Sequence, residues 1–169
     1  LKLERTPKGC SRCRRETEME IFRRGIVAVI RNPEGLLLLC ERSDLPGSWQ
    51  FPQGGIEGTE NSEQTFFREL GEELGNNHCR ILSMGNRWVR YRWPELGRDG
   101  VSGQEQIWFL GEFLENGEPM LDKSDRCFRA WRWVTVPEAL EGVVQWKRPA
   151  YEEGLASIGL RTSSSRKTL

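Results

Sequence analysis

The stretch that most constrains the fold of this chain of 169 residues is 54–75, where a glycine-rich turn leads into a segment with helical periodicity. At 100° per residue its large apolar residues share one arc of a helix, as amphipathic helices require: Phe66, Phe67, Leu70 and Leu74. Three acids share a separate arc, because neighbours at i+3 and i+4 lie on one face: Glu69, Glu72 and Glu73. The segment therefore predicts a helix that buries one side and gathers negative charge on another.

The residues at both ends of this segment predict where the helix begins and where it ends. Asn61 suits an N-cap, and Gln64 stands three residues later, at the capping-box position. Gly75 suits the left-handed position that ends a helix. We expect the helix to run from about residue 62 to residue 74.

The acidic arc indicates a metal site. Like charges at i+4 destabilise an isolated helix, and a cation removes that cost. Sites made only of carboxylates select hard ions, chiefly Mg²⁺, with Mn²⁺ as a substitute. Bound Mg²⁺ commonly joins carboxylates to substrate phosphates. Charge and periodicity alone leave a second interpretation open, in which the acids are a solvated helix face.

The rest of the chain predicts more strands than helices. Residues 25–30 and 36–40 are strand-like, and the turn at 32–35 between them predicts a hairpin. Pro52 argues against a long strand across 49–55. Further strands are expected at 80–84, 86–93, 106–112 and 131–136, and further helices from 137 and over 147–158, with Pro149 in the first turn. This order predicts an α+β fold, an α/β/α sandwich with a mixed sheet.

Composition and charge indicate which partners and which cellular compartment to expect. The formal net charge is zero, but residues 1–15 carry a net charge of +5, so we expect a basic, flexible arm at 1–20 and a Ser-rich basic tail at 159–169. No apolar run is long enough for a membrane span or a secretory signal, and five cysteines make an odd count, so we expect a cytoplasmic protein. Cys10 and Cys13 have the spacing of half a zinc knuckle, but no second pair follows. No stable protein partner can be inferred.

The spacing of the glycine turn and acidic helix resembles the Nudix box, the signature of hydrolases that cleave nucleoside diphosphates linked to another moiety. The fixed positions are matched by Gly54, Glu60, Arg68, Glu69, Leu70, Glu72, Glu73 and Gly75, and only the last, apolar position departs, as Asn76. The resemblance implies a Nudix-type sandwich over residues 21–158. It also implies that Glu69, Glu72 and Glu73, with Gly54, bind the metal, and that Arg68 and Glu60 support them.

The flanking segments are similar to one branch of that family, the bacterial RNA pyrophosphohydrolases and dinucleoside polyphosphate hydrolases. The similar segments are 49–56, 87–91, 103–110, 131–134 and 144–151. We therefore expect metal-dependent removal of pyrophosphate from the 5′-triphosphate end of RNA. Two alternatives stay open: hydrolysis of diadenosine polyphosphates, and a silent module that only binds nucleotides.

Substrate-binding residues are expected outside the box. Trp146 offers a ring for base stacking beside the Lys147 cation, although Trp146 is equally suited to the core. Arg23, Arg42 and Ser48 resemble positions near the phosphate path in relatives. Gln104 either contacts substrate or pairs across strands.

One position departs from the branch. A glutamate that usually precedes the Phe-x-x-Trp segment, and that serves as an extra metal ligand or base, is replaced by Cys127. The nearest acids are Asp125 and Asp122. Either one takes the role or the site holds fewer metals, so the general base is left open.

Overall fold

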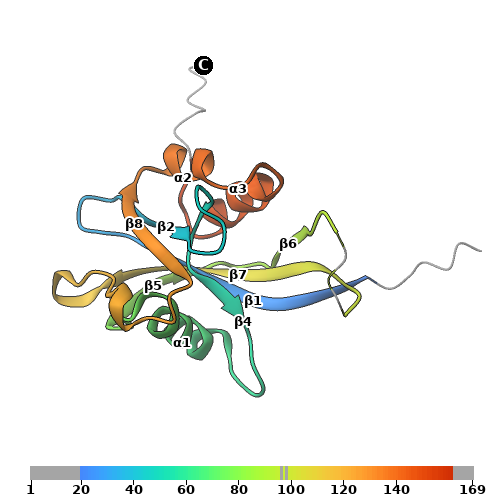
Figure 1. Ribbon diagram of the computed structural model, residues 1–169, viewed down its shortest axis with the longest axis horizontal. Coiled ribbons are helices and arrows are strands. Elements are labelled where there is room, and N and C mark those ends of the chain that lie inside the picture. The colour runs from blue at the N-terminus through green and yellow to red at the C-terminus, as the bar shows by residue number, and fades with distance from the viewer. Residues whose placement is uncertain (1–19, 96, 98, 162–169) are drawn as a thin grey trace, which may run out of the picture.

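A computed structural model describes residues 20–161 except 96 and 98, and its centre is a mixed five-stranded sheet (Figure 1). Two long strands, β1 (Ile21–Ile30) and β7 (Val101–Phe113), run parallel in the middle. The shorter strands all pair antiparallel with these two: β4 (Gln53–Gly55) with β1, and β5 (Cys79–Met84) and β6 (Val89–Arg92) with β7. The glycine-rich turn of the sequence thus supplies an edge strand beside β1.

A smaller sheet corrects one expectation. Strand β2 (Leu37–Arg42) lies between β3 (Trp49–Gln50) and β8 (Phe128–Val134). The predicted hairpin of β1 with β2 is wrong, because the two strands share only one isolated bridge, Arg31 to Leu37, and then enter different sheets. The turn itself is confirmed, with Gly35 at φ 84°. All four side chains from Leu37 to Cys40 are buried, which a strand packed between two layers requires and a hairpin does not.

Helices cover the five-stranded sheet on both sides. Helix α1 (Ser62–Leu74) lies on one side and α3 (Arg148–Ser157) on the other, while α2 (Val136–Gly142), next to α3, packs against β2 and β3 of the smaller sheet (Figure 1). Three short 3-10 turns complete the secondary structure of the described residues: Leu114–Asn116, Leu121–Lys123 and Gln145–Lys147. The predicted α+β sandwich with a mixed sheet is confirmed. None of the described helices is long and apolar enough to cross a membrane.

The predicted caps of α1 are confirmed. The Asn61 side chain accepts a hydrogen bond from the backbone N–H of Gln64, whose side chain accepts one in return from the Asn61 N–H. Gly75 ends the helix at φ 66°. A capping box and a left-handed stop fix the helix at both ends, so the rotation of its acidic arc is fixed as well.

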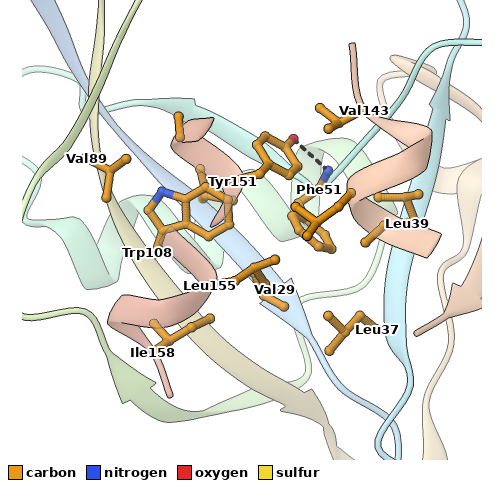
Figure 2. Packing of buried hydrophobic residues seen from close by; sticks show 14 of the residues in the cluster. Val29, Leu37, Leu39, Phe51, Val89, Trp108, Val143, Tyr151, Leu155 and Ile158 are labelled. Carbon is orange, nitrogen blue, oxygen red and sulfur yellow. Dashed lines mark hydrogen bonds between the residues drawn. The ribbon is translucent and has the colours of Figure 1, made fainter. Parts of the chain in front are cut away.

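The core on the α3 side fixes the segment that leads into β4. Tyr151 of α3 stacks on Phe51 with ring centres 5.2 Å apart and meets Trp108 edge-on at 5.1 Å. Its hydroxyl accepts a hydrogen bond of 3.2 Å from the backbone N–H of Phe51, drawn in Figure 2. Because Phe51 is two residues before Gln53, this packing holds the start of β4 in place.

Candidate active site

The acidic arc of α1 faces protein rather than solvent. Glu69 and Glu73 are only 7% and 8% exposed, whereas Glu72 is exposed. Helix α1 packs beside β4, and this contact covers the two acids. The interpretation of the arc as a solvated face is therefore excluded for Glu69 and Glu73.

Strand β4 is shaped to receive these two carboxylates. The backbone N–H of Gln53 donates a hydrogen bond of 2.9 Å to Glu73 Oε2. A Cβ added to Gly54 would overlap the carboxyl group of Glu69. A glycine at position 54 is thus required by the close approach of Glu69, and any larger residue would displace that carboxylate.

Arg68 uses all five of its N–H groups to hold this site together. Its Nε and Nη2 bind the two oxygens of Glu60, at 2.7 and 3.0 Å, and Nη2 also donates to the carbonyl oxygen of Gly55 at 2.8 Å. Its Nη1 donates to Glu69 at 2.8 Å and to Glu72 at 2.9 Å. The guanidinium is permanently charged and planar, so it joins the turn, Glu60 and the helix acids in one rigid unit.

Burial sets the protonation of the acids. The pKa of Glu73 is raised well above its usual value, mainly by burial, and the negative charges of Glu69 and Asp125 add to this. Burial also raises the pKa of Glu69, although the hydrogen bond from Arg68 opposes it. Arg68 lowers the pKa of Glu60 to about 2. Carboxylates that burial makes costly to ionise are stabilised by a nearby cation.

The donor set fits a hard divalent ion. Arg68 occupies one carboxylate oxygen each of Glu69 and Glu72, and the Gln53 N–H occupies one of Glu73. The described residues supply no donor to the other three oxygens, Glu69 Oε2, Glu72 Oε1 and Glu73 Oε1. Oxygen-only sites of this kind suit Mg²⁺ or Mn²⁺. Within residues 20–161, less 96 and 98, no three acids, cysteines or histidines already converge on one point. Because Glu72 is exposed and Arg68 holds only one of its oxygens, its side chain can turn toward the other two acids when a cation binds.

The comparison with known proteins agrees with this site. The profile described as NUDIX domain matches residues 21–154. The chain belongs to the Nudix family. The RNA pyrophosphohydrolase of Rhodospirillum rubrum is 34% identical over 143 residues, which cover 81% of this chain and 87% of that protein. Further relatives with the same name are 34% to 37% identical.

Solved structures share the Nudix fold. The E. coli dihydroneopterin triphosphate pyrophosphohydrolase superposes with a TM-score of 0.63 at 22% identity, over 79% of this chain and 97% of that one. A C. elegans Ap4A hydrolase, solved as a binary complex, superposes with a TM-score of 0.59 at 18% identity, over 79% and 96%. Enzymes of this family depend on a divalent metal, which is consistent with the free carboxylate oxygens around α1.

A cleft leads away from the Nudix acids. Its first pocket, about 430 Å³, is lined by Glu73, Gln53, Arg42, Asp125 and Cys127, among others. The second, about 620 Å³, is lined by Tyr91, Gln104, Trp146 and Lys147 and again by Arg42 and Gln53. Because Arg42 and Gln53 line both pockets, the two pockets adjoin, and we refer to them together as the cleft. We call its two parts the acidic end and the aromatic end.

The aromatic end pairs an exposed ring with a buried cation. Trp146 is 41% exposed and lies 5.6 Å from the Tyr91 ring, so it is not a core residue. The Lys147 ammonium lies 5.3 Å from the Trp146 ring centre and 5.4 Å from that of Tyr91. Burial, assisted by the positive charge of Arg42, lowers the pKa of Lys147 to about 8. No acid within the described part of the chain forms a salt bridge with Lys147.

Of the other residues expected to bind substrate, Gln104 and Arg42 line the cleft, whereas Arg23 and Ser48 do not. Gln104 lines the aromatic end and accepts a hydrogen bond of 2.8 Å from the Tyr91 hydroxyl. Arg42 lines both ends and is held by Asp44 through two bonds, of 2.8 and 2.6 Å. The Arg23 guanidinium lies against Gly55, where a Cβ would overlap it. Ser48 is buried in the turn before β3 and lines neither pocket.

Two residues at the centre of the cleft were not singled out from the sequence. Gln53 caps Glu73 through its backbone and accepts a hydrogen bond of 3.2 Å from the Gln106 side chain. Tyr91 forms the wall behind Trp146 and Lys147. Tyr91 could have been found from the alternation of apolar and charged residues in β6, where Val89 and Tyr91 are the buried residues. Gln53 has no comparable signal, because its contribution is a backbone N–H.

The structure also separates the two acids near Cys127. Asp125 lines the acidic end together with Glu73 and Cys127. One of its oxygens, Oδ1, accepts a hydrogen bond of 2.9 Å from the Cys127 N–H, and its own N–H donates to the Glu72 carbonyl oxygen at 2.7 Å. Asp122 lies in the 3-10 turn Leu121–Lys123, is exposed, and does not line this pocket.

Proposed function

We propose that this Nudix hydrolase removes pyrophosphate from the 5′-triphosphate end of RNA, with Mg²⁺ as its metal and Mn²⁺ as a substitute. The observation that carries the proposal is the cleft, which joins buried carboxylates at one end to an exposed tryptophan and a buried lysine at the other. Phosphates carrying a metal suit the first end, and an unstacked nucleotide suits the second. The names of the relatives support the same substrate class. The three unpaired cysteines among the described residues are consistent with a cytoplasmic location.

In this proposal the acids of α1 hold the metal and Arg68 fixes their positions. Glu69 and Glu73 supply the buried oxygens, and Glu72 supplies the exposed one. When bound, the divalent ion would neutralise phosphate charge and lower the pKa of water in the site. Lys147 and Arg42 add positive charge along the path from these acids to Trp146, where phosphate oxygens carry negative charge.

We further propose Asp125 as the residue that takes the proton from the attacking water. Its Oδ2 receives no hydrogen bond from the described residues, and the residue lines the same pocket as Glu73. A carboxylate in this place can stand in for the glutamate that Cys127 replaces. The Cys127 thiol is unsuited to the role, because burial and the adjacent Asp125 raise its pKa to about 12.

Substrate class is tested by one panel on one preparation. Triphosphorylated RNA and diadenosine tetra- and pentaphosphates are compared in Mg²⁺ and in Mn²⁺, with release of pyrophosphate and mononucleotides followed by chromatography. We expect the higher kcat/KM for RNA. Faster turnover of the dinucleotides would favour the alternative hydrolase. Binding of nucleotides without hydrolysis in either metal would indicate a silent module, against which the complete acid set argues.

The role of Asp125 is tested against its neighbour. Asp125→Asn should lower kcat by about 10² to 10⁴-fold, the usual contribution of a general base. Asp122→Asn, which changes the same chemical group outside the cleft, should leave kcat within about twofold of wild type, as surface changes usually do. Mn²⁺ affinity measured by calorimetry should be retained in Asp125→Asn. Equal kcat values for the two variants would reject the assignment.

A further inference from the structure

A polar side chain is buried in β7 beside the cleft. Gln106 is 2% exposed and lines neither end of the cleft. The residues that follow it in the strand, 107–110, are all buried and hydrophobic. A buried amide costs free energy unless it is hydrogen-bonded, and a hydrophobic side chain at this position would avoid that cost. Packing alone therefore does not explain a glutamine here.

The Gln106 amide connects two side chains that do line the cleft. Its Nε2 donates to Gln53 Oε1 at 3.2 Å and to Gln104 Oε1 at 2.9 Å. Gln104 Oε1 accepts a second hydrogen bond, of 2.8 Å, from the Tyr91 hydroxyl. Burial raises the pKa of Tyr91 to about 12, so this hydroxyl keeps its proton and remains a donor. Gln53 thus anchors the Gln106 amide, and Gln106 and Tyr91 together hold the Gln104 oxygen.

These bonds decide which way the Gln104 amide faces. An amide side chain accepts at its oxygen and donates at its nitrogen. Because Gln104 Oε1 faces two donors, Gln104 Nε2 faces away from them, and no acceptor among the described residues bonds to it. Turning the amide over would bring the NH₂ group of Gln104 against that of Gln106. Gln104 therefore keeps a donor available in the aromatic end, which it lines.

The direction of this amide matters for an anion. Arg42 and Lys147 line the same pocket, so phosphate oxygens are the groups that it attracts. An NH₂ group that faces such an oxygen donates a hydrogen bond, whereas the carbonyl oxygen of a reversed amide would repel it. The same glutamine helps or hinders phosphate binding according to its orientation, and Gln106 sets that orientation from outside the cleft.

We propose that Gln106 is a positioning residue for phosphate binding, which makes no contact with substrate and holds Gln104 so that Gln104 Nε2 donates to a phosphate in the cleft. The inference rests on the proposed function only in requiring that phosphates occupy the cleft. It holds whether those phosphates belong to RNA or to a dinucleotide. A change at Gln106 should weaken phosphate binding and leave the chemical step nearly unchanged.

The test separates binding from chemistry on the full chain. Inorganic tripolyphosphate, which has no base to stack, is titrated in Mg²⁺ by calorimetry, and kcat is measured with whichever substrate is turned over. Gln104→Leu should raise Kd about tenfold, the lower limit for a hydrogen bond to a charged group. Gln106→Met should raise Kd about fivefold, because Gln104 must then be ordered as the ligand binds. In Gln106→Met kcat should stay within about threefold of wild type, as for a loss of uniform binding.

The double variant distinguishes positioning from a general structural role. If Gln106 acts through Gln104, adding Gln106→Met to Gln104→Leu should change Kd by less than about twofold, because the effects of coupled residues do not add. Gln145→Met is the control, since Gln145 is exposed, precedes Trp146 and lines neither end of the cleft. Its Kd should stay within about twofold of wild type.

A second variant guards against misfolding. Gln106→Asn keeps an amide but draws it back by one methylene, so it should raise Kd as Gln106→Met does. Thermal melts check that each variant folds, and the loss of one to misfolding leaves the other to decide.

The outcomes keep this inference apart from the proposed function. Unchanged Kd in the Gln106 variants, additive effects in the double variant, or a fall in kcat at constant Kd overturns the positioning role and leaves the RNA substrate intact. Failure of wild type to bind tripolyphosphate overturns it as well. Hydrolysis of dinucleotides in place of RNA overturns the proposed function, while the expected Kd pattern would still support the role of Gln106.

Discussion

At one end of the cleft Glu73 is 8% exposed, and at the other end Lys147 is 7% exposed. Burial acts on both in the same physical way, because it disfavours the charged form. It raises the pKa of Glu73 well above the usual value and lowers that of Lys147 to about 8. The acidic end is therefore stabilised by a cation and the aromatic end by an anion. A nucleotide polyphosphate with its metal supplies both at once.

The two ends differ in how they are supported. At the acidic end, Arg68 donates to four partners and Gln53 caps Glu73, so the carboxylates are held before any ligand arrives. At the aromatic end, the Lys147 ammonium contacts the Tyr91 and Trp146 rings, and no acid among the described residues pairs with it. The metal end is therefore held in advance at Glu69 and Glu73, with only Glu72 left to turn, whereas the nucleotide end is completed by its substrate.

Loss of the acidic end should have the largest effect. Glu73→Gln keeps the size of the side chain but removes its charge. We expect kcat/KM to fall by about 10³-fold or more, since the metal contributes several kcal/mol to catalysis. The melting temperature measured in EDTA should rise, because a buried group that is costly to ionise is replaced by a neutral one. Activity assays and thermal melts check the two parts.

Glu63→Gln is the control for that change, because Glu63 is an exposed acid in the first turn of the same helix. Its activity should remain near wild type. A Glu73→Gln enzyme with metal-dependent activity close to that of Glu63→Gln would break the distinction between the two ends.

A smaller loss of activity is expected when Arg68 is replaced by another cation. Arg68→Lys retains a cation yet cannot present five N–H groups in a planar fork. We expect a loss of about 10- to 100-fold in activity and in Mn²⁺ affinity, as for other changes to groups that orient metal ligands. Arg148→Lys alters another arginine with an i+4 glutamate, Glu152, on the surface of α3, and should change neither quantity. Unchanged Mn²⁺ affinity in Arg68→Lys would show that the acidic end does not depend on preorganisation.

The sequence specified this acidic end well because its signals are local. The capping box at Asn61, the stop at Gly75 and the period of the glutamates all lie within one helix, and the structure agrees with each. The hairpin of β1 with β2 failed because the turn at 32–35 is compatible with two outcomes. Tertiary packing decides between them, and it sends β2 to the second sheet.

The aromatic end was only partly visible from the sequence. Trp146 and Lys147 were found as neighbours, but the burial of Lys147 depends on Tyr91, which is more than fifty residues away in the chain. The same holds for Gln53, whose backbone N–H reaches Glu73 on another element. The position of Gln53 depends on the packing of Phe51 on Tyr151, and such contacts between distant residues have no local pattern.

The smallest effect is expected from Lys147, and it depends on pH. Below about pH 8 the ammonium is charged and can bind phosphate, so we expect KM for RNA to rise as the pH passes through about 8. Lys147→Met should raise KM at pH 7 by about tenfold, near the lower limit for a hydrogen bond to a charged group. It should also remove the pH dependence of KM in this range. Initial-rate measurements from about pH 6.5 to about pH 9, on either side of the Lys147 pKa of about 8, check both expectations.

As the pH rises, the free energy of unfolding should increase, whereas the affinity for RNA should decrease. Folding lowers the pKa of Lys147 from 10.5 to about 8, so between these values the unfolded chain binds more protons than the folded one. The free energy of unfolding therefore rises with pH across this window, and the cost of the buried charge is fully present below pH 8. Lys147→Met should be more stable than wild type at pH 7, by at most about 3 kcal/mol, and the gain should shrink toward pH 10. Lys123→Met, at an exposed lysine, should show neither change. A Lys147→Met protein that is less stable at pH 7 would mean that the aromatic end is complete without its substrate.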